Sequence, residues 1–347
     1  MNKNLPIIPK GVYTHNEIYS QPDAWQAALT VLAENLSAIR SINPLQVNQV
    51  IFTGCGSTYY LAMAAASLTQ QLTHCPARGL PASELWLYPD TAYPTGQTLL
   101  IAISRSGETT ETLRACESFL ADHRGTLLTL SCYPEMPLAG MGAFNLVLPS
   151  GQEHSVAQTR AFSTLYLATT ALAVIWAERG DLFASLNELP NSCLRMLEKY
   201  SSLAADLAQD LSLERFYFLG SGPRYGLACE LSLKMKEMSL SHSEPFHFLE
   251  FRHGPKSMVT PSTLLLGLRS TINASYEEAV LADVRKLGGH TLVMGETEAE
   301  VSFESRLDEA ICNVLYLPFG QMFAFERAMA KGLNPDHPAN IESVVKI

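Results

Sequence analysis

Short apolar segments alternate with longer helical patterns along most of the chain. In the first half, the short apolar segments cover residues 49–53, 98–104, 125–131 and 145–148. The helical patterns cover residues 24–40, 59–72, 111–123 and 159–179. Strands that are apolar throughout and separated by helices are typical of a parallel sheet covered on both faces. The pattern therefore predicts an α/β fold.

The same alternation starts again in the second half. Its predicted helices cover residues 188–211, 226–239 and 275–287, and its predicted strands cover residues 215–219, 262–268 and 290–294. A strand followed by Gly-x-Gly and a helix occurs at Gly54 and again at Gly220, roughly 165 residues later, and such spacing indicates two copies of one unit. We expect a duplicated fold with a linker at 180–191.

Composition narrows the possible functions. Of the 347 residues, 47% are hydrophobic and 17% charged, which favours a large buried core, and the net charge is −10 with no Lys/Arg run. This pattern predicts neither nucleic-acid nor anionic-membrane binding. The seven scattered cysteines contain no C-x-x-C pair, so a reducing cytoplasm is expected. No signal peptide is expected at the start, and the apolar stretch 165–177 is too short to span a bilayer and predicts a buried helix.

Two loops rich in hydroxyl groups follow predicted strands. Ser104-Arg105-Ser106-Gly107-Glu108-Thr109 joins a buried strand to a helix, and Gly54-Cys55-Gly56-Ser57-Thr58 joins another. In a doubly wound sheet, ligands bind at the carboxyl ends of the strands. Hydroxyls, a glycine and the N–H groups of a helix N-terminus suit a phosphate dianion. The alternative interpretation is an ordinary turn capped by Ser or Thr.

A charged stripe stands out in the second half. Glu230, Lys234 and Glu237 follow the spacing i, i+4 and i+7, so that they share one face of a predicted helix. Such a stripe is usually a solvated helix face.

Taken together, these segments resemble the sugar isomerase (SIS) family. The resemblance rests on 54–58, 104–109, 151–162 and 230–255, and extends from about residue 17 to about residue 340. More narrowly, the chain resembles the isomerase half of glutamine–fructose-6-phosphate aminotransferase. The resemblance implies two tandem SIS domains, each a parallel-sheet, flavodoxin-like α/β/α sandwich. We expect an N-terminal arm at 1–28, SIS domains at 29–180 and 190–335, and a tail at 336–347 that closes over the site.

The resemblance also implies roles for individual residues. The substrate, mostly its phosphate, is expected to contact Ser57, Thr58, Ser104, Arg105, Ser106 and Thr109, with Gly56 a further candidate. Val156 falls where the family has a sugar-contacting valine, and Glu237 matches the glutamate that moves a proton between C1 and C2, with Lys234 beside it. His253, in Arg-His-Gly-Pro, matches the ring-opening acid/base, which is supplied across a homodimer interface.

Two departures from the aminotransferase change the expected reaction. The chain starts directly at the sugar-binding part, with no glutaminase segment, so glutamine-driven synthesis is not expected. Glu342 stands where the family's Schiff-base lysine would be, and a carboxylate cannot form an imine; Lys346 could serve if the register slips. The segment Phe-Arg-His-Gly-Pro-Lys-Ser and the tail resemble stand-alone amino-sugar-phosphate deaminase/isomerases and deglycases.

The resemblance and its two departures therefore imply an enzyme that opens a 6-phosphorylated amino sugar or sugar–amino-acid conjugate, moves a proton between C1 and C2, and releases an amine. Neither a metal nor a cofactor is expected, because acid/base groups can carry enolisation and the histidines lack ligand spacing. Three alternatives remain open. They are a simple aldose–ketose isomerase, an aminotransferase-like isomerase without a glutaminase domain, and a non-catalytic phosphosugar sensor.

Overall fold

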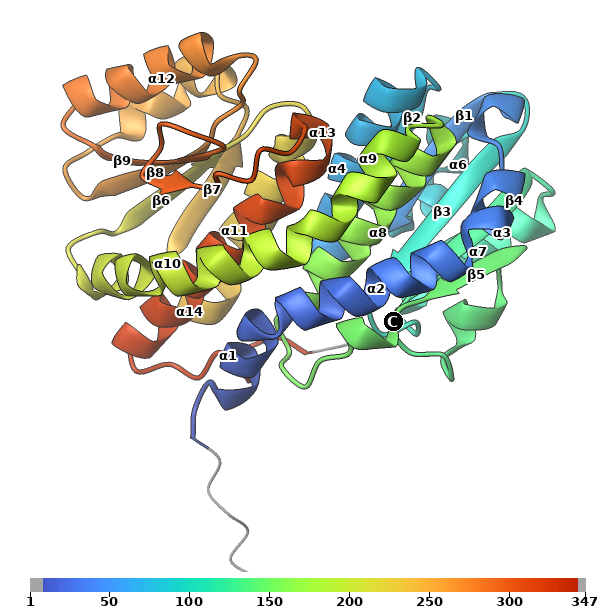
Figure 1. Ribbon diagram of the computed structural model, residues 1–347, viewed down its shortest axis with the longest axis horizontal. Helices are drawn as coiled ribbons and strands as arrows, with labels where there is room; N and C mark the ends of the chain where they lie inside the picture. The colour runs from blue at the N-terminus through green and yellow to red at the C-terminus, as the bar shows by residue number, and fades with distance from the viewer. Residues whose placement is uncertain (1–8, 343–347) are drawn as a thin grey trace, which may run out of the picture.

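Two parallel five-stranded sheets lie side by side in the computed structural model, which describes residues 9–342 (Figure 1). The first sheet has the order β2-β1-β3-β4-β5. Its strands are β1 (Gln49–Gly54), β2 (Ala77–Pro81), β3 (Thr98–Ser104), β4 (Gly125–Ser131) and β5 (Phe144–Val147). β1 and β3 are buried along their whole length, as expected for central strands covered on both faces.

The second sheet has the order β10-β9-β8-β6-β7 and is also parallel throughout. Its strands are β6 (Arg215–Leu219), β7 (His242–Phe246), β8 (Thr263–Leu268), β9 (His290–Gly295) and β10 (Val301–Ser302). Counted from the first strand of each unit, both sheets follow the order 2-1-3-4-5. In such a sheet the crevice for ligands lies at the carboxyl ends of strands 1 and 3, where the connections diverge.

Helices cover both faces of both sheets. The helices before and around the first sheet are α1 (Val12–Tyr19), α2 (Gln21–Glu34), α3 (Leu36–Ser41), α4 (Ser57–Thr73), α5 (Ala82–Leu87), α6 (Pro89–Ala92), α7 (Thr110–Ala121), α8 (Arg160–Trp176) and α9 (Gly180–Ser185). Those of the second unit are α10 (Leu189–Gln209), α11 (Pro223–Ser239), α12 (Ala274–Lys286), α13 (Glu309–Cys312) and α14 (Tyr316–Ala330).

Several sequence-based boundaries differ from the structure. The helix predicted at 24–40 is two helices, because the helix breaks at Asn35, whose side chain donates to the carbonyl of Val31 at 2.8 Å and so competes with the helical hydrogen bonds. The linker expected at 180–191 is mostly helical, since it contains α9 and the start of α10. The arm expected at 1–28 contains α1.

The three strands that the pattern missed, β2, β7 and β10, are edge strands. β2 and β7 contain Pro81 and Pro245 and have partly exposed side chains, so they lack the continuous apolar run of a central strand.

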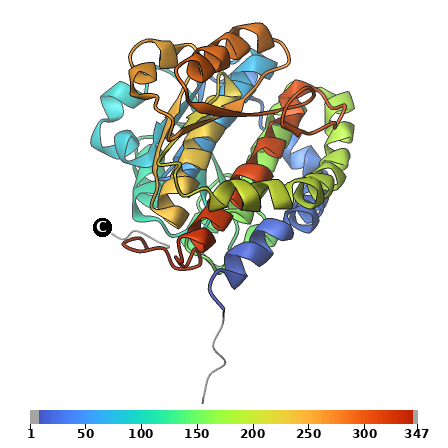
Figure 2. The same cartoon turned by 90° about the vertical axis from the view of Figure 1, so that its left-hand side faces the viewer.

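One hydrophobic core joins the two units. It includes Ala64 of α4, Leu227 and Leu231 of α11, and Phe323 of α14. α11 packs against both α4 and α14, and Figure 2 shows the red helix α14 running diagonally across the molecule. α8 is buried from Ala161 to Trp176, as the apolar stretch predicted. Among residues 9–342, no helix has both the length and the apolar character needed to cross a membrane.

The first loop of each unit has the same backbone. Gly56 has φ 55° and ψ −122°, and Gly222 has φ 59° and ψ −135°. Only glycine adopts this conformation readily. Gly56 follows Gly54 by two residues and directly precedes α4. Gly222 follows Gly220 by two residues and directly precedes α11. The duplication inferred from the Gly-x-Gly spacing is therefore present in the loops as well as in the sheets.

The helices α4 and α11 pack closely enough to require a glycine. A Cβ atom placed on Gly226 would lie 2.4 Å from the carbonyl oxygen of Tyr60 and 2.7 Å from the amide nitrogen of Ala64. Both are backbone atoms that cannot rotate away. The contact sets the distance between the two units.

We expect Gly226→Ala to destabilise the protein by about 1–3 kcal/mol, because the two helices must move apart. Chemical denaturation measures this change. Gly180→Ala is the matched control, because a Cβ at Gly180 meets nothing within 4 Å and alanine favours a helix. Equal stabilities of the two variants would contradict the proposed close contact.

Candidate active site

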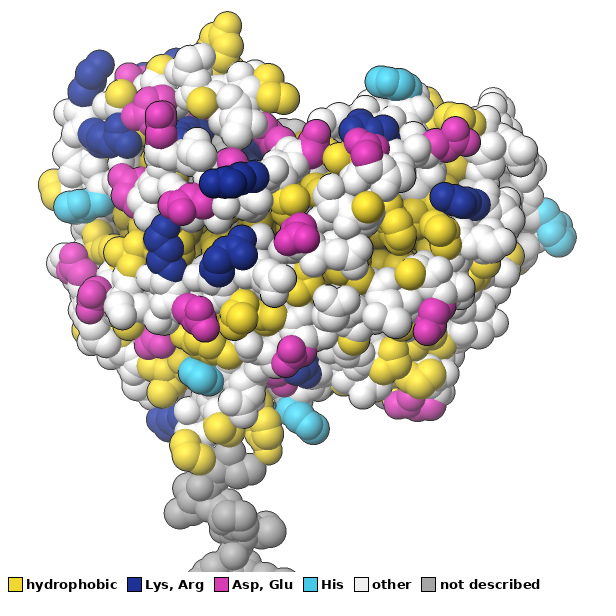
Figure 3. Space-filling model, in the orientation of Figure 1, with side chains coloured by type: hydrophobic (Ala, Val, Ile, Leu, Met, Phe, Trp, Pro, Cys, Tyr) yellow, Lys and Arg dark blue, Asp and Glu magenta, His cyan; other side chains and the backbone are white. Residues whose placement is uncertain are grey.

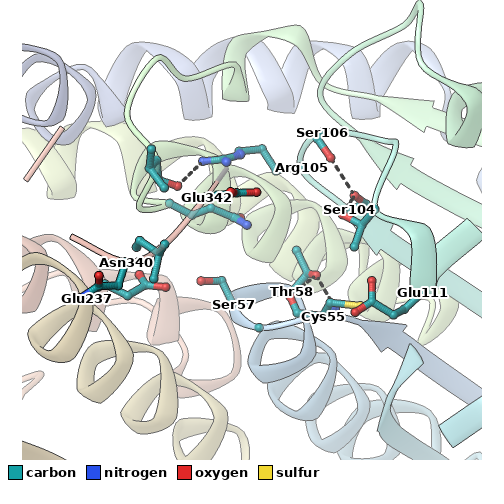
Figure 4. Close-up of a pocket in the computed structure, with 15 residues that line it drawn as sticks. Cys55, Ser57, Thr58, Ser104, Arg105, Ser106, Glu111, Glu237, Asn340 and Glu342 are labelled. Carbon is teal, nitrogen blue, oxygen red and sulfur yellow. Dashed lines mark hydrogen bonds between the residues drawn. The ribbon is translucent and has the colours of Figure 1, made fainter. Parts of the chain in front are cut away.

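A cavity of about 700 Å³ lies at the carboxyl ends of β1 and β3, where α11 and the C-terminal segment approach the first sheet (Figure 4). Its lining residues are Cys55, Gly56, Ser57, Thr58, Ser104, Arg105, Ser106, Thr109, Glu111, Val156, Gln158, Glu237, Asn340, Ile341 and Glu342. The structure thus brings the two hydroxyl-rich loops, the valine and the glutamate of the sequence-based hypothesis to one cavity.

Local hydrogen bonds fix the loop after β3. The hydroxyl of Ser104 accepts from the amide of Gly107 at 3.1 Å and lies 3.2 Å from the hydroxyl of Thr109. The hydroxyl of Ser106 accepts from the amide of Glu108 at 3.3 Å. Gly107 has φ 73°, a conformation that favours glycine. The loop therefore holds its hydroxyl groups in fixed positions around the N-terminal end of α7.

Arg105 binds the segment that carries Val156. Its Nη1 donates to the carbonyl oxygens of Ser155 at 3.2 Å and Val156 at 3.0 Å, and lies 3.4 Å from Oε2 of Glu153. The other oxygen of Glu153 accepts from the amides of Thr159 and Ala161 at the start of α8. Arg105 therefore joins the loop after β3 to the opposite wall of the cavity, in addition to lining it.

Two buried carboxylates attach the chain ends to this wall. Glu17 of α1 accepts from the amides of His154 at 2.6 Å and Ser155 at 3.1 Å. Asp336 accepts from both the amide and the hydroxyl of Thr14 at 2.8 Å, and its carbonyl accepts from the amide of Val156 at 3.0 Å. The arm and the tail are thus bound to each other beside the cavity.

The last described residues run along the cavity. Asn340, Ile341 and Glu342 line it, and Figure 4 shows Glu342 near Arg105. The closing of the tail over the site stays a prediction, and Lys346, the alternative imine-forming residue, lies outside the described residues.

The charged stripe of α11 is buried at the boundary between the units. Lys234 has no exposed surface; its Nζ contacts the carboxylate of Glu237 and donates to the hydroxyl of Ser57 at 3.1 Å. Nζ also lies 3.3 Å from Oε1 of Glu230, which is fully buried. The interpretation of this stripe as a solvated face is therefore wrong. Glu237 keeps 20% of its side chain exposed and faces the cavity.

Burial and neighbouring charges shift the pKa values of this cluster. Burial raises the pKa of Glu230 to about 8, against the opposing effect of the Lys234 ammonium and with a further increase from Glu237. Burial acts to lower the pKa of Lys234, but the carboxylates of Glu230 and Glu237 together raise it above its usual value. A lysine that stays charged and a carboxyl group that holds a proton near neutral pH lie side by side.

His253 lies apart from this cavity. It ends the short 3₁₀ turn Glu250–Arg252, is exposed, and is absent from the residues that line the cavity of its own chain. The expectation that a second copy supplies it stays a prediction.

Some lining residues were not singled out from the sequence. Glu111 lies in the first turn of α7, and its Oε2 is buried without a hydrogen-bond partner among the described residues. Its place two residues after Thr109 is the signal that could have identified it. Cys55 also lines the cavity. Burial raises the pKa of its thiol to about 11, so it stays protonated near neutral pH and is a poor nucleophile.

Comparisons with known proteins support the family resemblance. Residues 45–175 match the model of the SIS domain. Over its whole length the chain is 26% identical to glutamine–fructose-6-phosphate aminotransferase [isomerizing] of Thermosynechococcus vestitus, and it spans 62% of that protein. The chain covers about three fifths of the length of the curated relatives that it matches.

Two solved structures have the same fold over nearly the whole chain. Glucosamine-6-phosphate deaminase from Thermotoga maritima is 24% identical, with a TM-score of 0.81, over 96% of this chain and 100% of that one. Tagatose-6-phosphate ketose/aldose isomerase from Escherichia coli is 22% identical, with a TM-score of 0.84, over 96% of both chains. The match to the SIS domain model and the similarity to the aminotransferase confirm the resemblance that the motifs indicate.

The raised pKa of Glu230 predicts a pH effect on stability. A carboxyl group with a higher pKa in the folded state stabilises the fold at low pH; this contribution is complete below about 4.5 and is lost as the pH rises through about 8. Glu230→Gln cannot titrate. Its free energy of unfolding, measured in urea from pH 5 to 8.5, should therefore fall less steeply than that of the wild type. The exposed Glu198→Gln should parallel the wild type, and parallel behaviour of Glu230→Gln would contradict the assignment.

Proposed function

We propose that the chain binds a 6-phosphorylated amino sugar, or a sugar–amino-acid conjugate, and catalyses ring opening, proton transfer between C1 and C2, and release of the amine. The observation that carries this proposal is that one cavity contains both groups suited to bind a phosphate and a carboxylate suited to transfer a proton. Loops rich in hydroxyls line it together with Glu237, whose carboxylate pairs with the buried Lys234. In Figure 4 these groups lie on different sides of the cavity, so one substrate can contact both.

The phosphate is held at the hydroxyl-rich side. Ser57 and Thr58 at the start of α4, and Ser104, Ser106 and Thr109 around the start of α7, surround this side. The N-terminus of a helix attracts an anion through its N–H groups and dipole. Two helix starts with hydroxyl groups therefore suit a phosphate dianion, and Val156 contacts the sugar between the two ends.

The proton is moved at the opposite side. Glu237 takes a proton from the carbon next to the carbonyl and returns it to the neighbouring carbon, which a positioned carboxylate can do. Lys234 holds the carboxylate in place and can stabilise the negative charge that develops on the substrate oxygen. His253 of a second copy opens the ring in this proposal, since it does not line the cavity of its own chain.

The charges of the cavity favour a substrate that carries an amine. Three carboxylates, those of Glu111, Glu237 and Glu342, line it, and Arg105 is the one basic side chain among the described lining residues. Because Arg105 already contacts Glu153 and two carbonyls, the remaining negative charge suits an ammonium group. The glucosamine-6-phosphate deaminase of Thermotoga maritima, which has this fold, is consistent with this choice.

The reaction balances without a cofactor. An opened 2-amino aldose loses its C2 proton and gains one at C1, which gives an imine at C2; water then splits this imine into a ketose phosphate and ammonia. A conjugate with the amine on C1 follows the same steps in the opposite direction and gives an aldose phosphate and the free amine. The substrate's own nitrogen forms the imine, so no lysine is needed at position 342.

A simple aldose–ketose isomerase is the second candidate. The likeness to the tagatose-6-phosphate isomerase fold favours it, and it would use Glu237 in the same way. However, a simple isomerase reaction would not require the carboxylates of Glu111 and Glu342 in the cavity.

The first experiment compares hexose 6-phosphates with their 2-amino analogues and 1-amino-acid conjugates. We expect amine release matched by hexose phosphate formation from the amino substrates. Glu237→Gln should reduce kcat about 10²–10⁴-fold with little change in phosphosugar affinity measured by calorimetry. The exposed Glu198→Gln serves as control. Isomerisation of the hydroxy sugars with no amine release from any amino substrate would favour the second candidate, and an active Glu237→Gln would refute the proton-transfer assignment.

Glu342 provides a separate test of amine recognition. We expect Glu342→Gln to lower kcat/KM for an amino substrate about tenfold, which corresponds to ~1.4 kcal/mol, because a charge partner of the ammonium is lost. The value for a hydroxy analogue should change little. Steady-state kinetics on the matched pair measure the ratio. An equal loss for both substrates would place Glu342 in a structural role only.

A further inference from the structure

The second unit has loops equivalent to both walls of the phosphate site. In the first sheet Thr53 of β1 pairs with Ala102 of β3, and in the second Leu219 of β6 pairs with Gly267 of β8. Thr53 and Leu219 both precede the repeated Gly-x-Gly loop. Arg269-Ser270-Thr271 therefore stands where the first unit has Ser104-Arg105-Ser106, and the start of α11 stands where the first unit has the start of α4.

A carboxylate of the protein occupies the space between these second loops. Oε2 of Glu309 accepts from the amide of Thr271 at 3.0 Å and from the Thr271 hydroxyl. Oε1 accepts from the hydroxyl of Ser270 at 2.8 Å and contacts the guanidinium of Arg224. One backbone amide, two hydroxyls and a guanidinium thus converge on one anionic group, which is also a suitable donor set for a phosphate.

Buried groups around the carboxylate indicate an anion site. Arg224 is 5% exposed, and its Nε has no hydrogen-bond partner among the described residues. Arg224 takes the place of Thr58 at the start of the helix, as the common Gly-x-Gly loop shows. Burial acts to raise the pKa of Glu309, but the hydrogen bonds from Thr271 and the charge of Arg224 lower it, so the group stays an anion near neutral pH.

We propose that the loops of the second unit form a further anion cradle, suited to phosphate or a phosphate monoester, and that Glu309 closes it as an internal anion. We call the group formed by Arg224, Ser270 and Thr271 the second cradle. The fold thus provides two equivalent cradles, of which the first is open to a cavity and the second is filled.

The position of Glu309 explains why the second cradle is closed. Glu309 lies seven residues before Tyr316, the first residue of α14, and Glu153 lies seven residues before Arg160, the first residue of α8. Glu153 turns to the N-terminus of α8 and to Arg105, which leaves the first loops open. Glu309 instead turns into its own unit's loops. Glu153 and Glu309 thus occupy the same position in the repeat. Glu153 leaves the cradle of the first unit open, whereas Glu309 fills the cradle of the second.

The neighbouring Glu277 limits what the second cradle can bind. It is 2% exposed, its Oε2 accepts from the amide of Ser270 at 2.6 Å, and burial raises its pKa. A second carboxylate this close disfavours a dianion while it is ionised. We therefore expect phosphate to enter only after Glu309 has left, and to bind better at mildly acidic pH, where phosphate is a monoanion and Glu277 is more fully protonated.

The experiment removes the internal anion and supplies an external one. Glu309→Ala is made in a background of Ser106→Ala and Thr109→Ala, so that the first cradle contributes little. We expect 50 mM inorganic phosphate at pH 6.5, relative to chloride at equal ionic strength, to raise the Tm of this variant by at least about 3 °C more than that of the background, because a ligand stabilises the state that binds it. Adding Arg224→Ala should abolish the difference, whereas Glu304→Ala in place of Glu309→Ala should show none.

Two further measurements keep the test decisive. If Glu309→Ala does not fold, Glu309→Gln keeps the side-chain volume but gives up the charge, and phosphate should again raise its Tm more than that of the background. Phosphorus NMR titration should show binding to the folded variant that the background lacks. Equal responses of the Glu309 variants and the background would overturn the proposal. None of these results depends on turnover or on phosphate binding at the first cradle, so the proposed function can fail independently.

Discussion

The buried ammonium group of Lys234 is the interaction on which the shared site depends. An ammonium group without exposed surface is strongly disfavoured unless anions and acceptors surround it. Here Glu237 and Glu230 come from its own helix, and Ser57 comes from the other unit. Replacing any one of these four groups changes the hydrogen bonds and charge interactions of the other three. The cluster therefore fixes the distance between the catalytic candidate on α11 and the loop at the start of α4, and the glycine contact between these two helices keeps the units at that distance.

A second set of buried carboxylates builds the opposite wall. Glu17 and Asp336 bind backbone amides or hydroxyls of segments far apart in the sequence, and Glu153 binds the amides at the start of α8. Hydrogen bonds to charged acceptors are among the stronger ones in proteins. The wall around Val156 is thus held by the arm, the tail and Arg105 at once. On the face drawn in Figure 3, acidic and basic side chains are interspersed.

The central strands and the two hydroxyl-rich loops could be predicted from the sequence, because continuous apolar runs and Gly-Ser-Thr turns are local signals. The edge strands β2, β7 and β10 could not be predicted, because they lack a continuous apolar run; β7, for example, carries Glu244 and Pro245 and resembles a loop. The stripe of Glu230, Lys234 and Glu237 was found by its helical spacing, but whether it faced solvent depended on α4 packing against it. Local sequence patterns could not predict that Glu17 and Asp336 hold the cavity wall, because each binds a segment more than a hundred residues away.

The bond between Asp336 and Thr14 restricts the volume that the tail can explore. Glu342 lies six residues beyond Asp336 in the sequence, and six extended residues reach at most about 20 Å. A carboxylate confined to a sphere of that radius has an effective concentration on the order of 50 mM at the cavity, even before any contact favours it. If the tail closes over the site as predicted, its return after substrate entry would be governed by this short chain rather than by diffusion from solution.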